Sequence, residues 1–96
     1  MEIEKALAII QQRLQQAIES THFVEQSQER NIPKEEIRML LRTEKILGIV
    51  EQGDNTYKIW LSYNEYKDLN IIVRILEQGQ LKLITLLPCY CERRRR

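Results

Sequence analysis

The chain has few of the residues that interrupt regular structure, with three glycines and two prolines among its 96 residues. Because Gly and Pro supply many turn conformations, their scarcity predicts that most of the chain lies in helices and strands. This length suits one domain and is too short for two ordinary ones. Hydrophobic residues make up 43% and charged residues 30%, as in a folded domain. We therefore expect a single α+β domain over residues 1–92.

Long apolar stretches are also missing. No run approaches the roughly 20 residues needed to cross a bilayer, so we expect no membrane-spanning segment. The first ten residues, MEIEKALAII, place acidic residues before apolar ones. A secretory signal begins instead with a basic segment and continues with a longer apolar stretch. These features predict a cytoplasmic protein.

Cysteine and histidine, which often bind transition metals, are scarce as well. The two cysteines, Cys89 and Cys91, form a C-x-C pair that lacks the second half of a zinc site. Residues this close also strain a mutual disulfide, so we expect free thiols. The chain has no Gly-rich phosphate loop and no G-x-S-x-G or H-E-x-x-H motif. These absences disfavour metal-dependent, nucleotide-dependent and covalent-nucleophile enzymes, and we expect no cofactor.

Charge is unevenly distributed, although the net charge is only +1. Residues 93–96 are a tail of four arginines, which leaves residues 1–92 with eleven basic and fourteen acidic residues. A mildly acidic body is not typical of a nucleic-acid-binding protein. The tail could contact phosphates or an acidic partner, or it could be a solvated terminus.

The first half of the chain has helical periodicity. Residues 2–19 carry one apolar stripe, which is typical of an amphipathic helix, at Ile3, Leu7, Ile10, Leu14 and Ala17. This helix could pack on a sheet or form half of a dimer seam. A second helix is predicted over residues 20–32, capped by Ser20 or Thr21 and ended by Asn31. Pro33 then opens a third helix with the sequence PKEEIRMLLRTE.

The second half has the signals of strands joined by tight turns. Apolar segments rich in β-branched or alternating residues occur at 45–52, 57–63, 70–77 and 81–87. The turn sequences G-D-N and Q-G-Q join neighbouring segments, and Pro88 is expected to end the last strand. Short connections favour antiparallel pairing. The predicted fold is therefore a set of N-terminal helices followed by a four-stranded antiparallel β-meander.

Two residues of the second helix are candidates for chemistry. His22 is the only histidine, and its imidazole is suited to proton transfer near neutral pH. Arg30 follows eight residues later, within about 80° of His22 around a helix axis. The two could share a cleft at one edge of the sheet. Structural roles are the alternatives, and for Arg30 this means a favourable interaction with the helix dipole.

The strands contribute four more candidates. Arg74 interrupts an apolar segment that we expect to be buried, and a buried guanidinium must be paired or line a cleft. Lys58 and Thr85 are the polar members of their strands, and together with Arg74 they would suit an RNA phosphate. Trp60 could stack on a base. Packing of Trp60 and pairing of Arg74 with Glu51 or Glu77 are the alternatives.

The segment T-H-F-V-E-Q-S-Q-E-R-N-I-P-K-E-E-I at Thr21–Ile37 resembles the opening of a family of small prokaryotic domains. That family has a His at a helix start, an Arg about eight residues later, a short link and a meander. It is similar to the RelE/BrnT-like toxins, whose superfold includes barnase and colicin ribonucleases. The resemblance covers about residues 20–88, the expected core, with the helix at 2–19 as an addition. It implies a metal-independent ribonuclease paired with an antitoxin.

Two functional hypotheses follow. In the first, the domain cleaves RNA, with His22 in proton transfer, Arg30 and Arg74 binding phosphate, and Lys58 assisting. In the second, it is a non-catalytic binding or regulatory module that engages a protein partner or a second copy. The contact surface would then be the N-terminal helix or the exposed edge of the meander.

Overall fold

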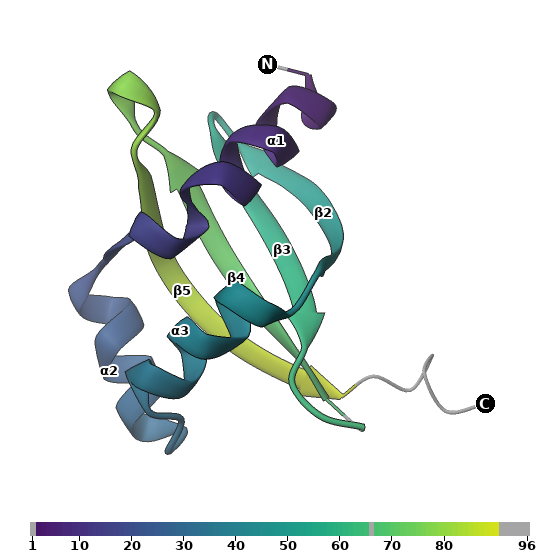
Figure 1. Ribbon diagram of the computed structural model, residues 1–96. Helices are drawn as coiled ribbons and strands as arrows, with labels where there is room; N and C mark the ends of the chain where they lie inside the picture. Colours follow the sequence, from purple (N-terminus) through teal and green to yellow (C-terminus); the bar gives the residue numbers. More distant parts are fainter. Residues whose placement is uncertain (1, 66, 91–96) are drawn as a thin grey trace.

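The computed structural model describes residues 2–65 and 67–90 and has the predicted α+β arrangement, with helices first and strands after them (Figure 1). Cys91 and the arginine tail at 93–96 lie outside the described residues. The elements, in chain order, are α1 (Ile3–Arg13), the 3₁₀ turn η1 (Leu14–Gln16), β1 (Ile18–Glu19), α2 (Thr21–Glu29), α3 (Lys34–Thr43), β2 (Ile46–Gly53), β3 (Thr56–Ser62), β4 (Lys67–Ile75), the 3₁₀ turn η2 (Glu77–Gly79) and β5 (Leu81–Tyr90).

The sheet has five strands in the order β1-β5-β4-β3-β2, so the prediction of four strands is wrong by one. Strands β2 to β5 form the expected antiparallel meander. The additional strand β1 pairs in parallel with β5, through Ile18 opposite Lys82 and Glu19 opposite Leu83. A strand of two residues is too short to produce a detectable alternation, which explains why sequence patterns miss it.

The helix predicted over residues 2–19 is also shorter than expected. It ends as α1 at Arg13, continues as η1, and reaches extended backbone at Ala17, with φ −65° and ψ 145°. Arg38 of α3 holds this extended segment. Its guanidinium donates hydrogen bonds to the carbonyl oxygens of Gln15 (3.3 Å) and Ala17 (2.7 Å) and pairs with the Glu19 carboxylate (3.2 Å). Carbonyl groups that a longer helix would have bonded internally are therefore bonded to α3.

The second and third helices begin as the sequence predicts. Ser20 Oγ accepts a hydrogen bond from the Phe23 N–H at 3.0 Å, which confirms the predicted cap of α2. The helix ends at Glu29, before the predicted boundary at residue 32. Asn31 adopts a φ of 57°, a left-handed conformation that Asn tolerates better than most residues. Pro33 directly precedes α3.

The strand boundaries differ from the predicted ones at several places. The segment predicted at 70–77 is strand β4 at 67–75, and the last strand continues past Pro88 to Tyr90. Pro88 pairs with Leu69 of β4, and among the described residues β4 is the only strand that pairs with β5 at this position. Strand β1 pairs with β5 only at Lys82 and Leu83. The Leu86 N–H, two residues before Pro88, points away from β4 toward Gln26, so by alternation the missing N–H of Pro88 costs no bond to β4.

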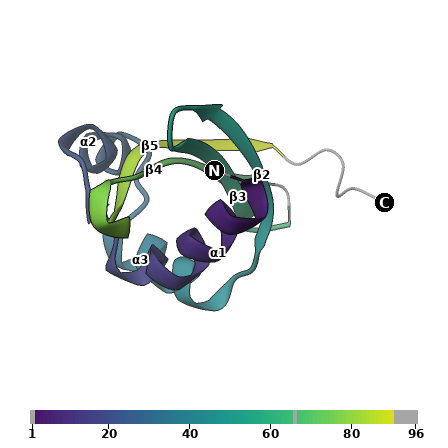
Figure 2. The same cartoon turned by 90° about the horizontal axis from the view of Figure 1, so that it is seen from above.

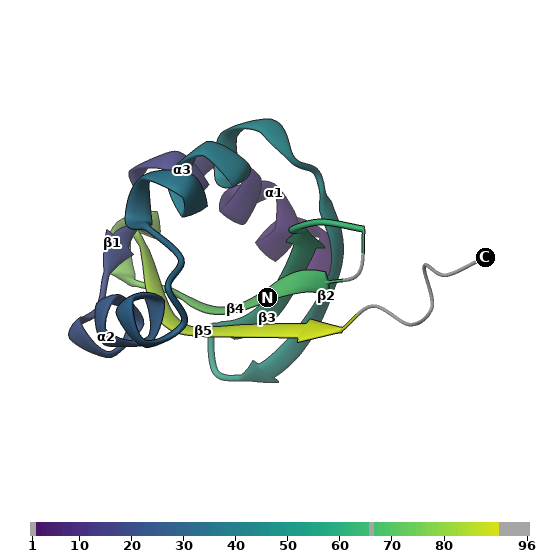
Figure 3. The same cartoon turned by 90° about the horizontal axis from the view of Figure 1, so that it is seen from below.

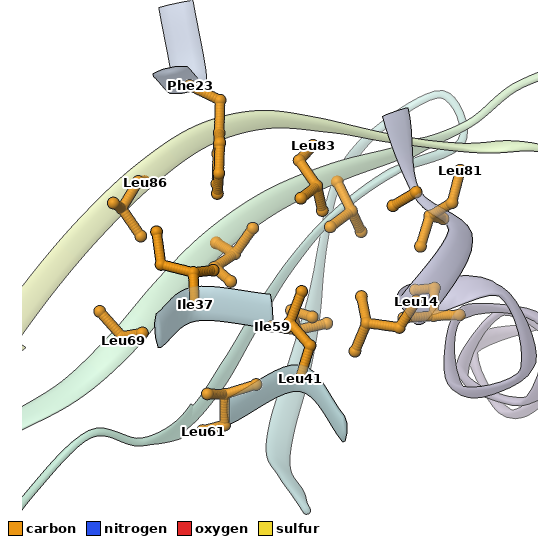
Figure 4. Close-up of a cluster of buried hydrophobic side chains, with 14 of the residues drawn as sticks. Leu14, Phe23, Ile37, Leu41, Ile59, Leu61, Leu69, Leu81, Leu83 and Leu86 are labelled. Atoms are coloured by element: carbon orange, nitrogen blue, oxygen red, sulfur yellow. The ribbon is translucent and has the colours of Figure 1, made fainter. Parts of the chain in front are cut away.

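The sheet curves around α1 and α3, which lie against its inner face, and α2 lies beside β5 (Figures 1, 2 and 3). Alternate strand residues point into this space and form one hydrophobic core with the helices (Figure 4). Helix α1 and η1 contribute Ala6, Ile10 and Leu14 to this hydrophobic core. No helix in the described parts of the chain is long and apolar enough to cross a membrane.

Candidate nucleic-acid interface

The face of the sheet opposite α1 and α3 is the outer face, and it carries the four candidate residues of the strands. The strand pairing places the side chains of this face in rows that run across the strands. The first row is Thr56, Arg74 and Lys82; the second is Val50, Lys58, Ile72 and Thr85; the third is Gly48, Trp60, Asn70 and Leu87. Lys58, Trp60, Arg74 and Thr85 therefore share one surface.

The outer face is open at one end and buried at the other. Arg74 is exposed, whereas Asn70 is only 9% exposed and Asp68 is fully buried. Asp68 belongs to the same strand as Arg74 but lies six residues away, a separation of about 20 Å along an extended chain. Its carboxyl group is therefore too distant to neutralise the cations at the open end.

Trp60 lies in the third row of the outer face, next to the edge strand β2. Its indole ring crosses to the edge strand and lies over Gly48, where a Cβ atom would come within 2.0 Å of the ring atom Cζ2. Lys58 Nζ lies 5.9 Å from the centroid of the same ring, within the range of a cation–π interaction. Trp60 as a whole is partly exposed. A flat aromatic surface next to a cation is a suitable arrangement for stacking an unpaired base.

Arg74 does not have the buried environment that its apolar neighbours predicted. Helices cover only the inner face, so Val73 and Ile75 are buried while Arg74 points outward and is exposed. Its Nε–H donates a hydrogen bond to Thr56 Oγ1 at 3.2 Å. The predicted alternatives, pairing with Glu51 or Glu77, are not present among the described residues. The guanidinium is therefore a cation on an open surface.

Thr85 lies beside a β-bulge to which α2 is attached. Ile84 is the extra residue, because Thr85 pairs with Ile72 and Leu83 pairs with Val73. The bulge leaves backbone groups that β4 does not bind. Ser20 donates hydrogen bonds to the carbonyl oxygens of Leu83 through its N–H and of Ile84 through its hydroxyl, both at 3.0 Å. Gln26 Oε1 accepts a bond from the Leu86 N–H at 2.8 Å. Helix α2 is thus fixed to β5.

His22 and Arg30 lie at the two ends of α2 rather than on the outer face. Both side chains are exposed, because α2 turns Phe23, Gln26 and Ser27 toward the core instead. Eight residues of helix separate the two by about 12 Å along the axis. Arg30 is the C-cap, where a cation interacts favourably with the helix dipole. The expected cleft shared by His22 and Arg30 is therefore not evident in the geometry of α2.

A depression of about 410 Å³ lies at the connection between α2 and α3. It is lined by Ser27, Gln28, Asn31, Ile32, Pro33, Lys34 and Glu35, and so includes neither His22 nor Arg30. The described residues contain no group of three or more His, Cys, Asp or Glu side chains placed to hold a metal ion.

Two tyrosines have raised pKa values, and neither belongs to the outer face. Burial raises the pKa of Tyr57 above its ordinary value of 10.0, and the nearby Glu51 carboxylate raises it further. Burial also raises the pKa of Tyr63, and Glu36 adds to the rise through its charge and a hydrogen bond. Both hydroxyls stay protonated near neutral pH, so neither is suited to act as a general base.

Sequence patterns missed two residues of the outer face. Lys82 lies between the buried Leu81 and Leu83, and this alternation alone could have identified it. Thr56 had no such signal, because it belongs to the outer face only through its pairing with Arg74. Comparisons of the chain with protein families, curated proteins and solved structures found no match. The outer face and α2 are therefore the parts of the molecule from which function can be inferred.

Proposed function

We propose that the chain is an RNA-binding, ribonuclease-like domain of the toxin type, acting in the cytoplasm, with the outer face as its RNA surface. The observation that carries this proposal is the placement of Lys58, Arg74, Lys82 and the partly exposed Trp60 on one face of the sheet, with Lys58 next to the indole ring. Cations attract the phosphate backbone, and a partly exposed indole can stack on a base. The mildly acidic composition is compatible with this, because none of Lys58, Arg74 and Lys82 forms an ion pair with an acid in the described residues.

The RelE/barnase-like fold implied by the resemblance is part of the proposal. Its support is the order of elements, with helices followed by an antiparallel group of strands. In this class of enzyme the ribose 2′-oxygen attacks the adjacent phosphorus, a 2′,3′-cyclic phosphate forms, and the bond to the 5′-oxygen breaks as that oxygen takes up a proton from water. The RNA would cross β5, to which α2 is attached, so that His22 would take the proton of the 2′-hydroxyl. Arg74, with assistance from Lys58, would stabilise the charge that develops on the phosphate oxygens, and Arg30 would bind a flanking phosphate.

Binding is tested by the fluorescence anisotropy of a labelled single-stranded RNA. The variant Lys58→Ala/Arg74→Ala removes two cations from the outer face. The matched control Lys5→Ala/Arg42→Ala removes two exposed cations from α1 and α3. The proposal expects the first variant to lose about tenfold or more in affinity and to show a weaker salt dependence, since it makes fewer phosphate contacts. Equal losses in both variants would mean that the attraction is not specific to this face.

Cleavage is tested separately, with RNA and EDTA present, by following the appearance of 2′,3′-cyclic ends. His22→Ala is expected to abolish cleavage and to retain RNA binding, because His22 is exposed and supports no core packing. Cleavage that is the same for wild type and His22→Ala would remove the catalytic part of the proposal. Loss of cleavage in EDTA would contradict its metal independence.

A second function, as a protein-binding module, is favoured by the edge strand β2. Leu47 and Val50 of this strand are 51% and 43% exposed, and β2 is the last strand in the order of the described sheet. An antitoxin-like partner or a second copy could pair with this edge. The N-terminal helix is less suitable as a dimer seam, because its Ala6 and Ile10 are buried in the core. Sedimentation of wild type and Leu47→Lys/Val50→Lys tests self-association at this edge.

A further inference from the structure

The two cations of the first row of the outer face are direct neighbours on adjacent strands. Arg74 of β4 is paired with Lys82 of β5, and both side chains point outward. Directly opposed residues of an antiparallel pair have Cβ atoms about 4.5–5.5 Å apart, and like charges in such positions destabilise a sheet. Neither residue forms an ion pair with an acid in the described part of the chain. A ligand with negative charge would relieve this repulsion.

Thr56 fixes one side of the Arg74 guanidinium. The Thr56 hydroxyl donates its proton to the Asp54 carbonyl oxygen at 3.0 Å, so its lone pairs are available to accept the bond from Arg74 Nε at 3.2 Å. With Nε occupied, the two terminal nitrogens of the guanidinium are the donors left for a ligand. A guanidinium held in this way is suited to bidentate binding of phosphate, and the Lys82 ammonium adds a second positive charge.

The acid on the neighbouring strand β1 is already paired, and a further cation lies nearby on β3. Glu19 follows Ile18 in β1, but its carboxylate is engaged by Arg38 and Lys34 of α3. Lys58 follows in the next row along β3, two residues from Thr56, which is about 6.6 Å along an extended strand. A chain of phosphates lying along β3 and β4 could therefore meet Arg74 and Lys82 first and Lys58 next.

We propose that Arg74 and Lys82 form a phosphate-binding subsite on the outer face, with Thr56 as the residue that positions the Arg74 guanidinium. The occupant is a phosphodiester of the RNA backbone, so the identity of the ligand rests on the proposed function. Anion binding at Thr56, Arg74 and Lys82 can also be tested without RNA, by adding inorganic phosphate.

The first measurement follows ¹H–¹⁵N signals, including that of the Arg74 Nε–H group, while phosphate or chloride is added at equal ionic strength. Phosphate is expected to shift the signals of Thr56, Arg74 and Lys82, and chloride is not. Lys82→Gln is expected to weaken phosphate binding about tenfold, whereas Lys5→Gln on α1 leaves it unchanged. Equal phosphate responses in wild type and Lys82→Gln would overturn the subsite.

The second measurement is thermal unfolding of wild type and Lys82→Gln. The variant is expected to be the more stable protein in chloride and to gain less stability from phosphate. In chloride, Lys82→Gln is expected to unfold roughly 1–6 °C above wild type, because the like-charge pair is gone. Adding phosphate is expected to raise the unfolding temperature of wild type more than that of the variant. A variant that is no more stable in chloride and gains as much from phosphate would contradict the proposal.

Thr56 is tested by Thr56→Val, which keeps the shape of the side chain and removes the hydroxyl. Phosphate binding is expected to weaken several-fold and to recover in Thr56→Ser, since serine can accept the same bond. If Thr56→Ser binds as weakly as Thr56→Val, the positioning role is wrong.

RNA-binding measurements distinguish a failure of the phosphate subsite from a failure of the proposed function. If RNA binds and Arg74→Gln/Lys82→Gln binds it equally well, the subsite is wrong while the RNA-binding function stands. If phosphate binds at Arg74 and Lys82 but RNA does not bind, the subsite stands as an anion site and the proposed function fails.

Discussion

The Trp60 ring lies directly over Gly48 of the neighbouring strand, in space that any side chain at position 48 would occupy. This relationship joins the edge strand β2 to the middle of the outer face. An aromatic ring that covers a glycine on an adjacent strand shields exposed backbone and compensates for the weak strand preference of Gly. The orientation of the only tryptophan in the chain therefore depends on the absence of a Cβ atom at Gly48.

Substitution of Gly48 by alanine is the most direct test of this relationship. The new Cβ would lie 2.0 Å from Trp60 Cζ2, so the ring must move. We expect Gly48→Ala to lower the free energy of unfolding by about 1–3 kcal/mol, as overpacking does, and to shift tryptophan emission. Gly53→Ala is the control, because nothing lies within 4 Å of its Cβ position. Equal stability of the two variants would contradict the contact.

The attachment of α2 to β5 predicts a second stability effect. Gln26 Oε1 is the acceptor for the Leu86 N–H at the bulge, in a buried position. Gln26→Ala leaves that N–H without its partner, which we expect to lower the free energy of unfolding by about 1–3 kcal/mol. Hydrogen exchange of the Leu86 amide should become faster. Gln28→Ala, at an exposed position of the same helix, should change neither quantity by much.

Arg38 predicts a third effect, at the start of the chain. Its guanidinium bonds two carbonyl oxygens of the segment before β1 and pairs with Glu19. We expect Arg38→Ala to lower the free energy of unfolding by about 1–3 kcal/mol, because hydrogen bonds from a charged group are among the stronger ones. Arg42→Ala removes an exposed arginine from the same helix and should change stability by only tenths of a kcal/mol. Similar effects of both variants would argue against a specific role for Arg38.

The two tyrosines predict how stability depends on alkaline pH. Their pKa values are higher in the folded protein than the ordinary value of 10.0, so folding favours the protonated hydroxyl. Their contribution is complete below pH 10 and is lost as the pH rises through the higher folded pKa. We expect the free energy of unfolding to fall above pH 10 in wild type and to fall less steeply in Tyr57→Phe. Parallel curves for the two proteins would contradict a raised pKa for Tyr57.

The sequence predicted the order of elements because helical and alternating patterns are local. It also identified Ser20 as a helix cap and the turn before β3. It did not predict β1, since two residues carry no period, nor the end of α1, since the bonds from Arg38 come from a distant helix. Arg74 was expected to be buried because Ile72 and Leu76 flank it. Which side of a strand the helices cover is a tertiary property that these neighbours do not encode.

The candidate site was predicted only in part, because local patterns identify single residues but not how the strands are aligned. Lys58, Trp60 and Thr85 were chosen as polar or aromatic members of strands, and register places all three on the outer face with Arg74. The pairing of Arg74 with Lys82 depends on the alignment of two strands and on the bulge at Ile84, which the sequence does not specify. His22 and Arg30 were joined by helical spacing alone, and spacing does not say which side of α2 faces the sheet.

The central claim is that RNA binds the outer face, and chemical-shift mapping of ¹⁵N-labelled protein with single-stranded RNA tests it most directly. The single tryptophan gives one indole N–H signal, which reports on Trp60 without ambiguity. The account predicts that RNA shifts this signal together with those of Lys58, Arg74 and Lys82, and leaves α1 and α3 unchanged. Shifts concentrated on the helices, or no shifts at all, would contradict it.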